Sequence, residues 1–152
     1  ATVSWCHLND EGHMLERMID GAVEVEGADT DERKEEIFEA FEQGQIKQLV
    51  TKPTIAGSGL KWQHCHHQTF FPSHSFEQWY QAIRRCWRFG QKKEVRVDVI
   101  SSEGEAGVVA NLRRKSEAAD RMFAQLVALM NDTLRIEKQE NNINNQQNPS
   151  WL

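Results

Sequence analysis

Strand-like and helix-like segments alternate along the first 101 residues, and this alternation constrains the fold more than any other feature of the sequence. Short apolar or alternating runs predict strands at 2–6, 22–27, 46–51, 67–71 and 95–100. Between several of them, apolar residues recur at helical spacing, which predicts helices over 11–20, 29–44 and 75–90. Strands that alternate with helices form parallel sheets, so we expect an α/β fold with helices on both faces of a parallel sheet.

A longer helical pattern follows the last strand, from Glu103 to about Lys138. Its apolar face comprises Val108, Val109, Leu112, Met122, Leu126, Leu129 and Met130. Such a helix could bind a partner, but helices of this kind more often pack back on their own domain or on a neighbouring domain of the same protein. The Asn/Gln-rich end of the chain is expected to be a disordered tail. We therefore divide the chain into a core (1–102), a helical extension (103–138) and a tail (139–152).

Composition excludes several classes of protein. No apolar run approaches the roughly 20 residues of a membrane span, so no membrane partner is expected. The three cysteines, Cys6, Cys65 and Cys86, are odd in number and scattered. A disulfide framework does not fit this distribution, whereas a reducing cytoplasm does.

The net charge of −5 conceals a strong asymmetry along the chain. Residues 1–42 contain 13 Asp/Glu and 3 Lys/Arg, whereas residues 43–96 contain 2 Asp/Glu and 9 Lys/Arg. A basic middle between acidic flanks could bind phosphates, because anion binding depends on the local field. A solvated charged surface is the simpler interpretation of the same pattern.

The helix expected over 75–90 concentrates this positive charge. Ser75 followed by Gln78 is a capping-box pattern that predicts the start of the helix, and Gly90 predicts its end. At about 100° per residue, one stripe of this helix holds Gln81, Arg85 and Arg88, with Arg84 on its edge. The opposite stripe holds Trp79, Ile83 and Cys86, flanked by Trp87.

This division predicts that the helix buries its aromatic side and holds its guanidinium groups outward. Planar guanidinium groups suit phosphate oxygens, since each can donate two hydrogen bonds at once. On helical spacing alone, a solvated amphipathic helix is the favoured interpretation of the pattern.

The residues QAIRRCWRFGQ (81–91) contain the pattern Q-x-x-x-R-x-x-R-x-G-Q, which resembles motif VI of superfamily 2 helicases in its Swi/Snf-type version. QLVTKPTIAGSGLKWQ (48–63) resembles motif V, and VSWCHLND (3–10) resembles the strand of motif IV. GADTDERKEEIFEAFEQG (27–44) matches a further family stretch at Gly27, Thr30, Arg33, Ile37 and Phe41. The resemblance covers about residues 2–101.

This resemblance implies the C-terminal, second RecA-like domain of a two-domain motor, with ATP and Mg²⁺ bound between the domains. The N-terminal RecA-like domain of the same parent protein would supply the Walker A lysine and the Mg²⁺-binding acidic box. Arg85 and Arg88 would be arginine fingers that reach the γ-phosphate. Gln81, Gly57 and Gly59 would also belong to the ATP cleft.

The same resemblance implies contacts with nucleic acid through Thr30, Thr51, Lys52 and Lys61, directed to sugar and phosphate rather than to bases. DNA is the expected partner, with duplex DNA favoured. The alternative is a standalone nucleic-acid-binding or adaptor module that retains the motor fold without ATPase activity. An unrelated α/β enzyme is a third interpretation, for which the sequence offers no nucleophile–base pair.

The chain contains no G-x-x-x-x-G-K-[ST] motif and cannot build a Walker-type nucleotide site alone. We expect the parent protein to be a helicase or translocase that hydrolyses ATP. The isolated chain is therefore expected to be inactive. Its abrupt start at a strand, without Met, suggests a fragment of a longer polypeptide.

The sequence departs from the Swi/Snf-type pattern at three positions. Lys61 stands where Asn or Asp is usual, Pro53 lies in a lengthened loop, and Trp87 replaces the usual His between the arginines. The variants W-C (5–6), K-W-Q (61–63) and R-C-W-R-F-G-Q (85–91) resemble phage and prophage helicases of this group.

The run HCHH at 64–67, with Cys6 and His7, contains zinc-ligating residue types. Its spacing lacks a C-x-x-C pair, and consecutive residues of a strand point to opposite faces. We therefore expect no metal site there, and we expect Cys86 to belong to the core rather than to act as a nucleophile.

Overall fold

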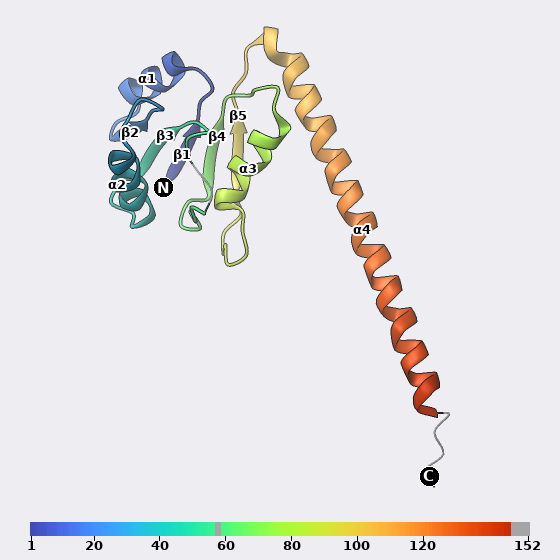
Figure 1. Cartoon of the computed structure of the whole chain (residues 1–152). Helices are drawn as coiled ribbons and strands as arrows, with labels where there is room; N and C mark the ends of the chain where they lie inside the picture. The colour runs from blue at the N-terminus through green and yellow to red at the C-terminus, as the bar shows by residue number, and fades with distance from the viewer. Residues whose placement is uncertain (57–58, 147–152) are drawn as a thin grey trace. The chain divides into compact units, whose positions relative to one another are not determined.

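The computed structural model describes residues 1–56 and 59–146, with side chains up to Met130. The chain forms two compact units, Ala1–Leu112 and Arg113–Leu152. The first unit contains a five-stranded parallel sheet in the order β2–β3–β1–β4–β5 (Figure 1). The strands are β1 (Thr2–Trp5), β2 (Ala22–Val25), β3 (Gln48–Thr51), β4 (His67–Phe70) and β5 (Arg96–Val99). The parallel sheet predicted from the sequence is confirmed.

Three helices connect strands of this sheet: α1 (Asn9–Met18), α2 (Asp31–Glu42) and α3 (Phe76–Cys86). The chain steps in one direction along the sheet from β1 to β2, and in the other direction from β2 to β3 and from β4 to β5. Because parallel crossovers are right-handed, α1 lies on one face of the sheet, and α2 and α3 lie on the other.

The main hydrophobic core lies between the sheet and the two helices on one of its faces, α2 and α3. Alternate residues of each strand point to this face, and apolar residues of both helices pack on them. The fully or nearly fully buried members include Val3, Trp5, Val25, Phe41, Leu49, Phe70, Ala82 and Cys86. Burying these side chains supplies most of the free energy that holds the helices on the sheet.

The connection from β3 to β4 contains no helix in its described residues, 52–56 and 59–66. It crosses β1 to reach β4, because β1 separates these strands in the sheet. Trp62 lies in this connection and belongs to the main hydrophobic core. Its side chain is fully buried, stacks on Trp5 at 5.7 Å between ring centroids and meets Phe41 edge-on at 5.2 Å.

The face that carries α1 is more polar. Ser4, Glu24 and Val50 alternate with the core residues of their strands and are all buried there. Acidic residues of an alternating strand usually face water, but α1 covers Glu24 and leaves it 5% exposed. Gly12 permits this close approach, since a Cβ at this position would lie 1.9 Å from Glu24 Oε1.

Helix α4 (Ala106–Gln146) follows a short 3₁₀ turn, η1 (Glu103–Glu105), and crosses the boundary between the two units. It extends beyond Lys138, where the sequence pattern placed its end, and residues 147–152 of the expected tail lie outside the described residues. Between 121 and 130 its side chains are exposed, including the apolar Met122, Leu126 and Leu129. No helix among the described residues is long and apolar enough to cross a membrane.

Candidate functional site

Helix α3 determines where the arginines lie. Its start agrees with the capping-box prediction, because the Ser75 hydroxyl accepts a hydrogen bond from the Gln78 backbone N–H at 3.3 Å. Its end comes four residues earlier than predicted, at Cys86, because Trp87 leaves the helical conformation with φ −91° and ψ 84°. Arg88 therefore lies in the turn after the helix, and Gly90 completes this turn at φ +95°.

Arg85 and Arg88 nevertheless line one hollow of about 800 Å³, which we call the arginine hollow. Of the residues predicted for the ATP cleft, Gln81 and Gly59 line it as well, whereas Gly57 lies outside the described residues. Among the described residues, the lining comprises Pro53, Thr54, Gly59, Tyr80, Gln81, Arg84, Arg85, Arg88 and Phe89. Residues that follow β3 and residues of α3 thus meet at one concave surface.

The arginine hollow has a positive electrostatic field. Burial, and secondarily the nearby charge of Arg88, lowers the pKa of Arg85, which still remains ionised at neutral pH. Within the described side chains, neither arginine forms an ion pair with a carboxylate, and Arg88 Nη1 lies 3.4 Å from Leu60 O. Two neighbouring guanidinium groups without a counter-ion favour the binding of an anion.

Arg84 differs from these two arginines. Its guanidinium carbon lies 5.5 Å from the ring centroid of Tyr80 and 5.1 Å from that of Trp87, which are cation–π distances. Trp87 is 54% exposed, so the prediction that it lies on a buried flank is wrong. The early end of α3 explains the difference, because Trp87 no longer follows the helical stripe of Ile83.

Hydrogen bonds join the end of α3 to the segment before β4. The Trp62 N–H donates to Arg85 O at 3.1 Å, and the Gln63 side-chain amide donates to Phe89 O at 2.6 Å. The Gln91 amide nitrogen lies 2.9 Å from Gln63 O, 3.0 Å from Cys65 O and 3.2 Å from Cys86 O. These contacts fix the backbone on both sides of Arg88.

Sequence reasoning gave Gln63 and Gln91 no role, although both belong to the quoted motifs. It also missed Gln68, whose amide is fully buried beneath α3. Gln68 Oε1 accepts a hydrogen bond from the Trp5 indole at 2.8 Å, and its nitrogen donates to Ile83 O at 3.3 Å. A glutamine in a strand-like segment gives no sign of this, since only the packed fold reveals its partners.

The residues predicted to contact nucleic acid do not behave alike. Thr30 is exposed as the N-cap of α2, and Lys61 is exposed as well. Lys52 is half-buried and donates a hydrogen bond to Asn9 Oδ1. Because β2 and β3 are parallel neighbours, Thr30 and Lys52 follow strands that end at the same edge of the sheet.

Thr51 departs from its predicted role. Its side chain is fully buried, and its hydroxyl donates to Val25 O at 3.2 Å. Strand β3 lies between β2 and β1, and Thr51 points to the face covered by α2 and α3, so it has no access to solvent. Its hydroxyl joins the ends of two strands and cannot reach a nucleic-acid backbone.

The cysteines are buried in the core. The Cys86 thiol is fully buried, and its hydrogen bond with Cys65 together with burial raises its pKa, which suppresses the thiolate. Burial also raises the pKa of Cys6 to about 11. Cys65 Sγ lies 3.3 Å from His67 O, and His67 Nε2 pairs with Asp98 Oδ2 at 2.7 Å. The prediction that Cys86 belongs to the core is confirmed.

Comparison with known proteins identifies the fold. No protein-family profile matches the chain, and no curated protein matches its sequence. Two of the solved structures that it resembles are the C-terminal part of the Fun30 ATPase domain and the C-terminal domain of the DEAD-box protein Dbp5. The TM-scores are 0.61 and 0.62, at sequence identities of 14% and 12%.

The matches cover 73% and 76% of this chain, but 38% of the Fun30 chain and 69% of the Dbp5 chain. At these identities the likeness concerns the fold. The five-stranded parallel sheet and its flanking helices agree with this fold. The chain therefore has a RecA-like α/β fold, similar to that of these two C-terminal domains.

Proposed function

We propose that this chain is the second motor domain of a nucleic-acid-dependent ATPase, a helicase or translocase. In this proposal Arg85 and Arg88 act as arginine fingers on ATP that the first RecA-like domain of the parent protein binds. The observation that carries the proposal is the arginine hollow, in which both guanidinium groups lie together without a carboxylate partner among the described side chains. An arginine finger neutralises charge that develops on the transferred phosphoryl group.

The exposed aromatic residues beside the hollow also support this proposal. Phe89 is fully exposed and lines the hollow, and Trp87 is 54% exposed immediately before Arg88. Large exposed apolar side chains around a charged hollow are typical of surfaces that bind another protein domain. A first motor domain would cover these rings and bring its nucleotide to the arginines.

ATP and Mg²⁺ are the proposed cofactors, held mainly by the first domain. The chain has no Walker A motif, so its residues do not form a complete nucleotide site. Its arginines could contact the γ-phosphate of ATP that the first domain binds. The isolated chain should then hydrolyse no ATP.

Nucleic acid is the proposed partner at the carboxyl edge of β2 and β3. Thr30 and Lys52 lie at this edge and could contact sugar and phosphate groups, with Lys61 as a further exposed cation. We favour duplex DNA because of the Swi/Snf-type form of motif VI. Thr51 takes part only by holding the strand ends together.

The proposal is tested by measuring ATP turnover of the parent polypeptide with and without duplex DNA. We expect DNA to stimulate turnover, and Arg88→Ala or Arg85→Ala to lower kcat about 10³-fold or more while ATP still binds. Arg113→Ala is a matched control, since Arg113 is exposed on α4 and pairs with Glu117 at 3.5 Å. This control should retain full activity.

Turnover that is unaffected by both Arg85→Ala and Arg88→Ala would refute the finger assignment. If the parent polypeptide bound DNA but showed no ATPase activity, the adaptor or binding-module interpretation would replace the motor. Fluorescence anisotropy with labelled duplex DNA separates these outcomes, because it measures binding without hydrolysis.

A further inference from the structure

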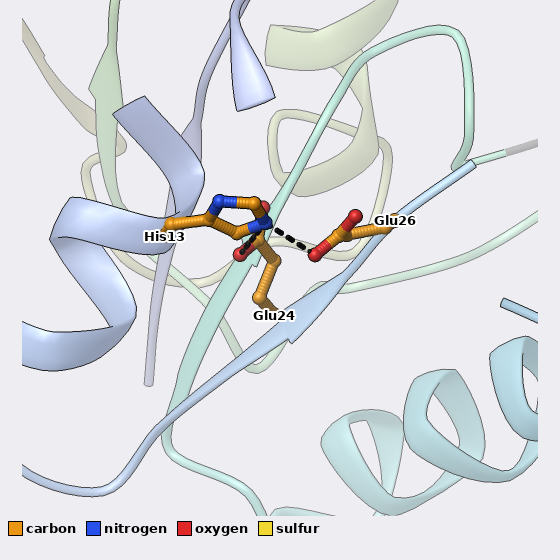
Figure 2. A group of neighbouring side chains, drawn as sticks. All are labelled: His13, Glu24 and Glu26. Carbon is orange, nitrogen blue, oxygen red and sulfur yellow. Dashed lines mark hydrogen bonds and ion pairs between the residues drawn. The ribbon is translucent and has the colours of Figure 1, made fainter. Parts of the chain in front are cut away.

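Three side chains with metal-binding atoms converge on the opposite side of the domain from the main core, between α1 and β2. His13 projects from α1, Glu24 lies in β2, and Glu26 directly follows this strand (Figure 2). Glu24 and Glu26 are two residues apart in extended chain, so they point to the same face. This is the face that α1 covers.

The ligand atoms are close enough to share one ion. His13 Nε2 lies 2.6 Å from Glu26 Oε1 and 3.9 Å from Glu24 Oε2, and all three atoms lie within 4.8 Å of one another. Ligand atoms around a zinc ion bound at about 2.0–2.2 Å are roughly 3–3.5 Å apart. Only small movements are needed, and the part-exposed side chains of His13 and Glu26 can make them.

One atom of the cluster lacks a partner. Glu24 Oε2 is buried and accepts no hydrogen bond, and the Glu24 side chain is only 4% exposed. It is directed toward His13, at a distance beyond hydrogen-bond range (Figure 2). Buried carboxylate oxygens are almost always paired with a donor or a metal ion, so this oxygen is a candidate ligand atom.

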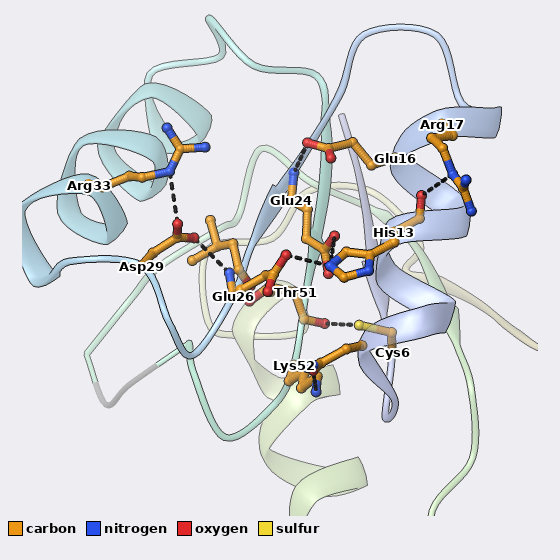
Figure 3. A network of polar contacts seen from close by, with 12 residues as sticks. Cys6, His13, Glu16, Arg17, Glu24, Glu26, Asp29, Arg33, Thr51 and Lys52 are labelled. Carbon is orange, nitrogen blue, oxygen red and sulfur yellow. Dashed lines mark hydrogen bonds and ion pairs between the residues drawn. The ribbon is translucent and has the colours of Figure 1, made fainter.

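The surrounding structure holds Glu24 and Glu26 in place (Figure 3). Glu16 Oε1 accepts a hydrogen bond from the Glu24 backbone N–H at 3.0 Å, and Asp29 Oδ2 accepts one from the Glu26 backbone N–H at 2.8 Å. Gly12 leaves space for the Glu24 carboxylate, which a Cβ would occupy. Backbone positions fixed in this way resemble the support that metal ligands receive from their neighbours.

We propose that His13, Glu24 and Glu26 bind one divalent transition-metal ion, with Zn²⁺ as the preferred ion. One imidazole nitrogen and two carboxylate oxygens suit Zn²⁺, and water can complete the coordination because His13 is 46% exposed. The ion would replace the hydrogen bond between His13 and Glu26 and would satisfy Glu24 Oε2. It would thereby join α1 to the end of β2, independently of any motor activity.

The test uses the full chain, purified without metal, and titrates it with Zn²⁺ by isothermal titration calorimetry. We expect one high-affinity Zn²⁺ per chain, and binding at least about tenfold weaker in His13→Ala and in Glu26→Gln. His74→Ala is a matched control, because His74 is exposed outside the cluster and should leave the affinity unchanged. Zn²⁺ should also raise the melting temperature of the unmodified chain and of His74→Ala, but not that of His13→Ala or Glu26→Gln.

Equal Zn²⁺ affinity in all four proteins would overturn the proposal, since the ion would then bind elsewhere, for example at the histidines of 64–67. Equally tight binding of Mg²⁺ would overturn the choice of metal, because Mg²⁺ does not favour imidazole. If either variant failed to fold, anomalous diffraction at the zinc edge from crystals of the unmodified chain would still locate the ion. A peak between His13 and Glu24 supports the site, and a peak elsewhere refutes it.

Discussion

At the scale of single residues, buried or partly buried glutamine amides fix the backbone that carries the arginines of the hollow. The amides of Gln63 and Gln91 join the turn around Arg88 to the segment before β4, and the amide of Gln68 holds α3 on the sheet. An amide can be buried without the cost of burying a charge, and it both donates and accepts hydrogen bonds. Among the described side chains, Arg85 and Arg88 form no ion pair with a carboxylate, and the one hydrogen bond from their guanidinium groups goes from Arg88 Nη1 to Leu60 O.

Gly90 provides a prediction at this scale. It adopts φ +95°, where other residues are strained, and an added Cβ would lie 3.1 Å from Gln63 Nε2. Gly90→Ala should therefore lower the free energy of unfolding by about 1–2 kcal/mol. Urea denaturation followed by tryptophan fluorescence measures this change.

Gly107→Ala is the matched control, because Gly107 lies in helix α4 and an added Cβ would meet nothing within 4 Å outside the helix's own backbone. This substitution should be neutral or should stabilise the chain by up to about 1 kcal/mol. If Gly90→Ala also left the unfolding midpoint unchanged, the turn around Arg88 would not be fixed as the structure indicates.

At the scale of elements, periodicity predicted the strands and helices of the first 101 residues but could not predict what each face meets. Thr51 ends a strand-like run whose burial depends on β3 lying between two other strands. Glu24 lies in the strand predicted over 22–27, where an acidic residue would usually face water, and α1 buries it. Similarly, the helical stripe placed Arg88 beside Arg85, although α3 ends first and a turn stabilised by Gln91 brings the two together.

The edge strand β5 provides a prediction about pH. The hydrogen bond from His67, and then that from Arg96, lowers the pKa of Asp98 below its ordinary value. A carboxyl group whose pKa is lower in the folded state stabilises the fold above its unfolded pKa of about 3.9, and this contribution disappears as the pH falls through the folded pKa. Asp98→Asn should therefore destabilise the chain at pH 6, and the difference should shrink below pH 4.

Urea denaturation of both proteins between pH 3 and pH 7 measures this difference. Asp120→Asn on α4 is a suitable control, because Asp120 is exposed in the second unit. A difference between Asp98→Asn and the unmodified chain that stayed constant down to pH 3 would show that packing, and not the lowered pKa, accounts for the loss.

At the scale of the whole molecule, the core and the arginine hollow belong to the first unit alone. The residues of the main core extend from Val3 to Cys86, with Val97 packed against them, and Leu112 is the last buried apolar residue among the described side chains. The hollow is lined by residues between Pro53 and Phe89. Most of the fold and the proposed contribution to ATP hydrolysis thus depend on residues 1–112.

A chain that ends after Leu112 should therefore fold as the full chain does. It loses helical signal in far-UV circular dichroism, because most of α4 is removed. Its free energy of unfolding, measured by urea denaturation, should change by no more than about 0.5 kcal/mol. A chain that ends after Ser101 provides the contrast, since it also loses the buried Leu112 and should be less stable. The contrary result is that removing residues 113–152 lowers the urea midpoint as much as removing 102–152. Residues 113–152 would then belong to the folding unit, and their exposed apolar side chains would contribute to its stability.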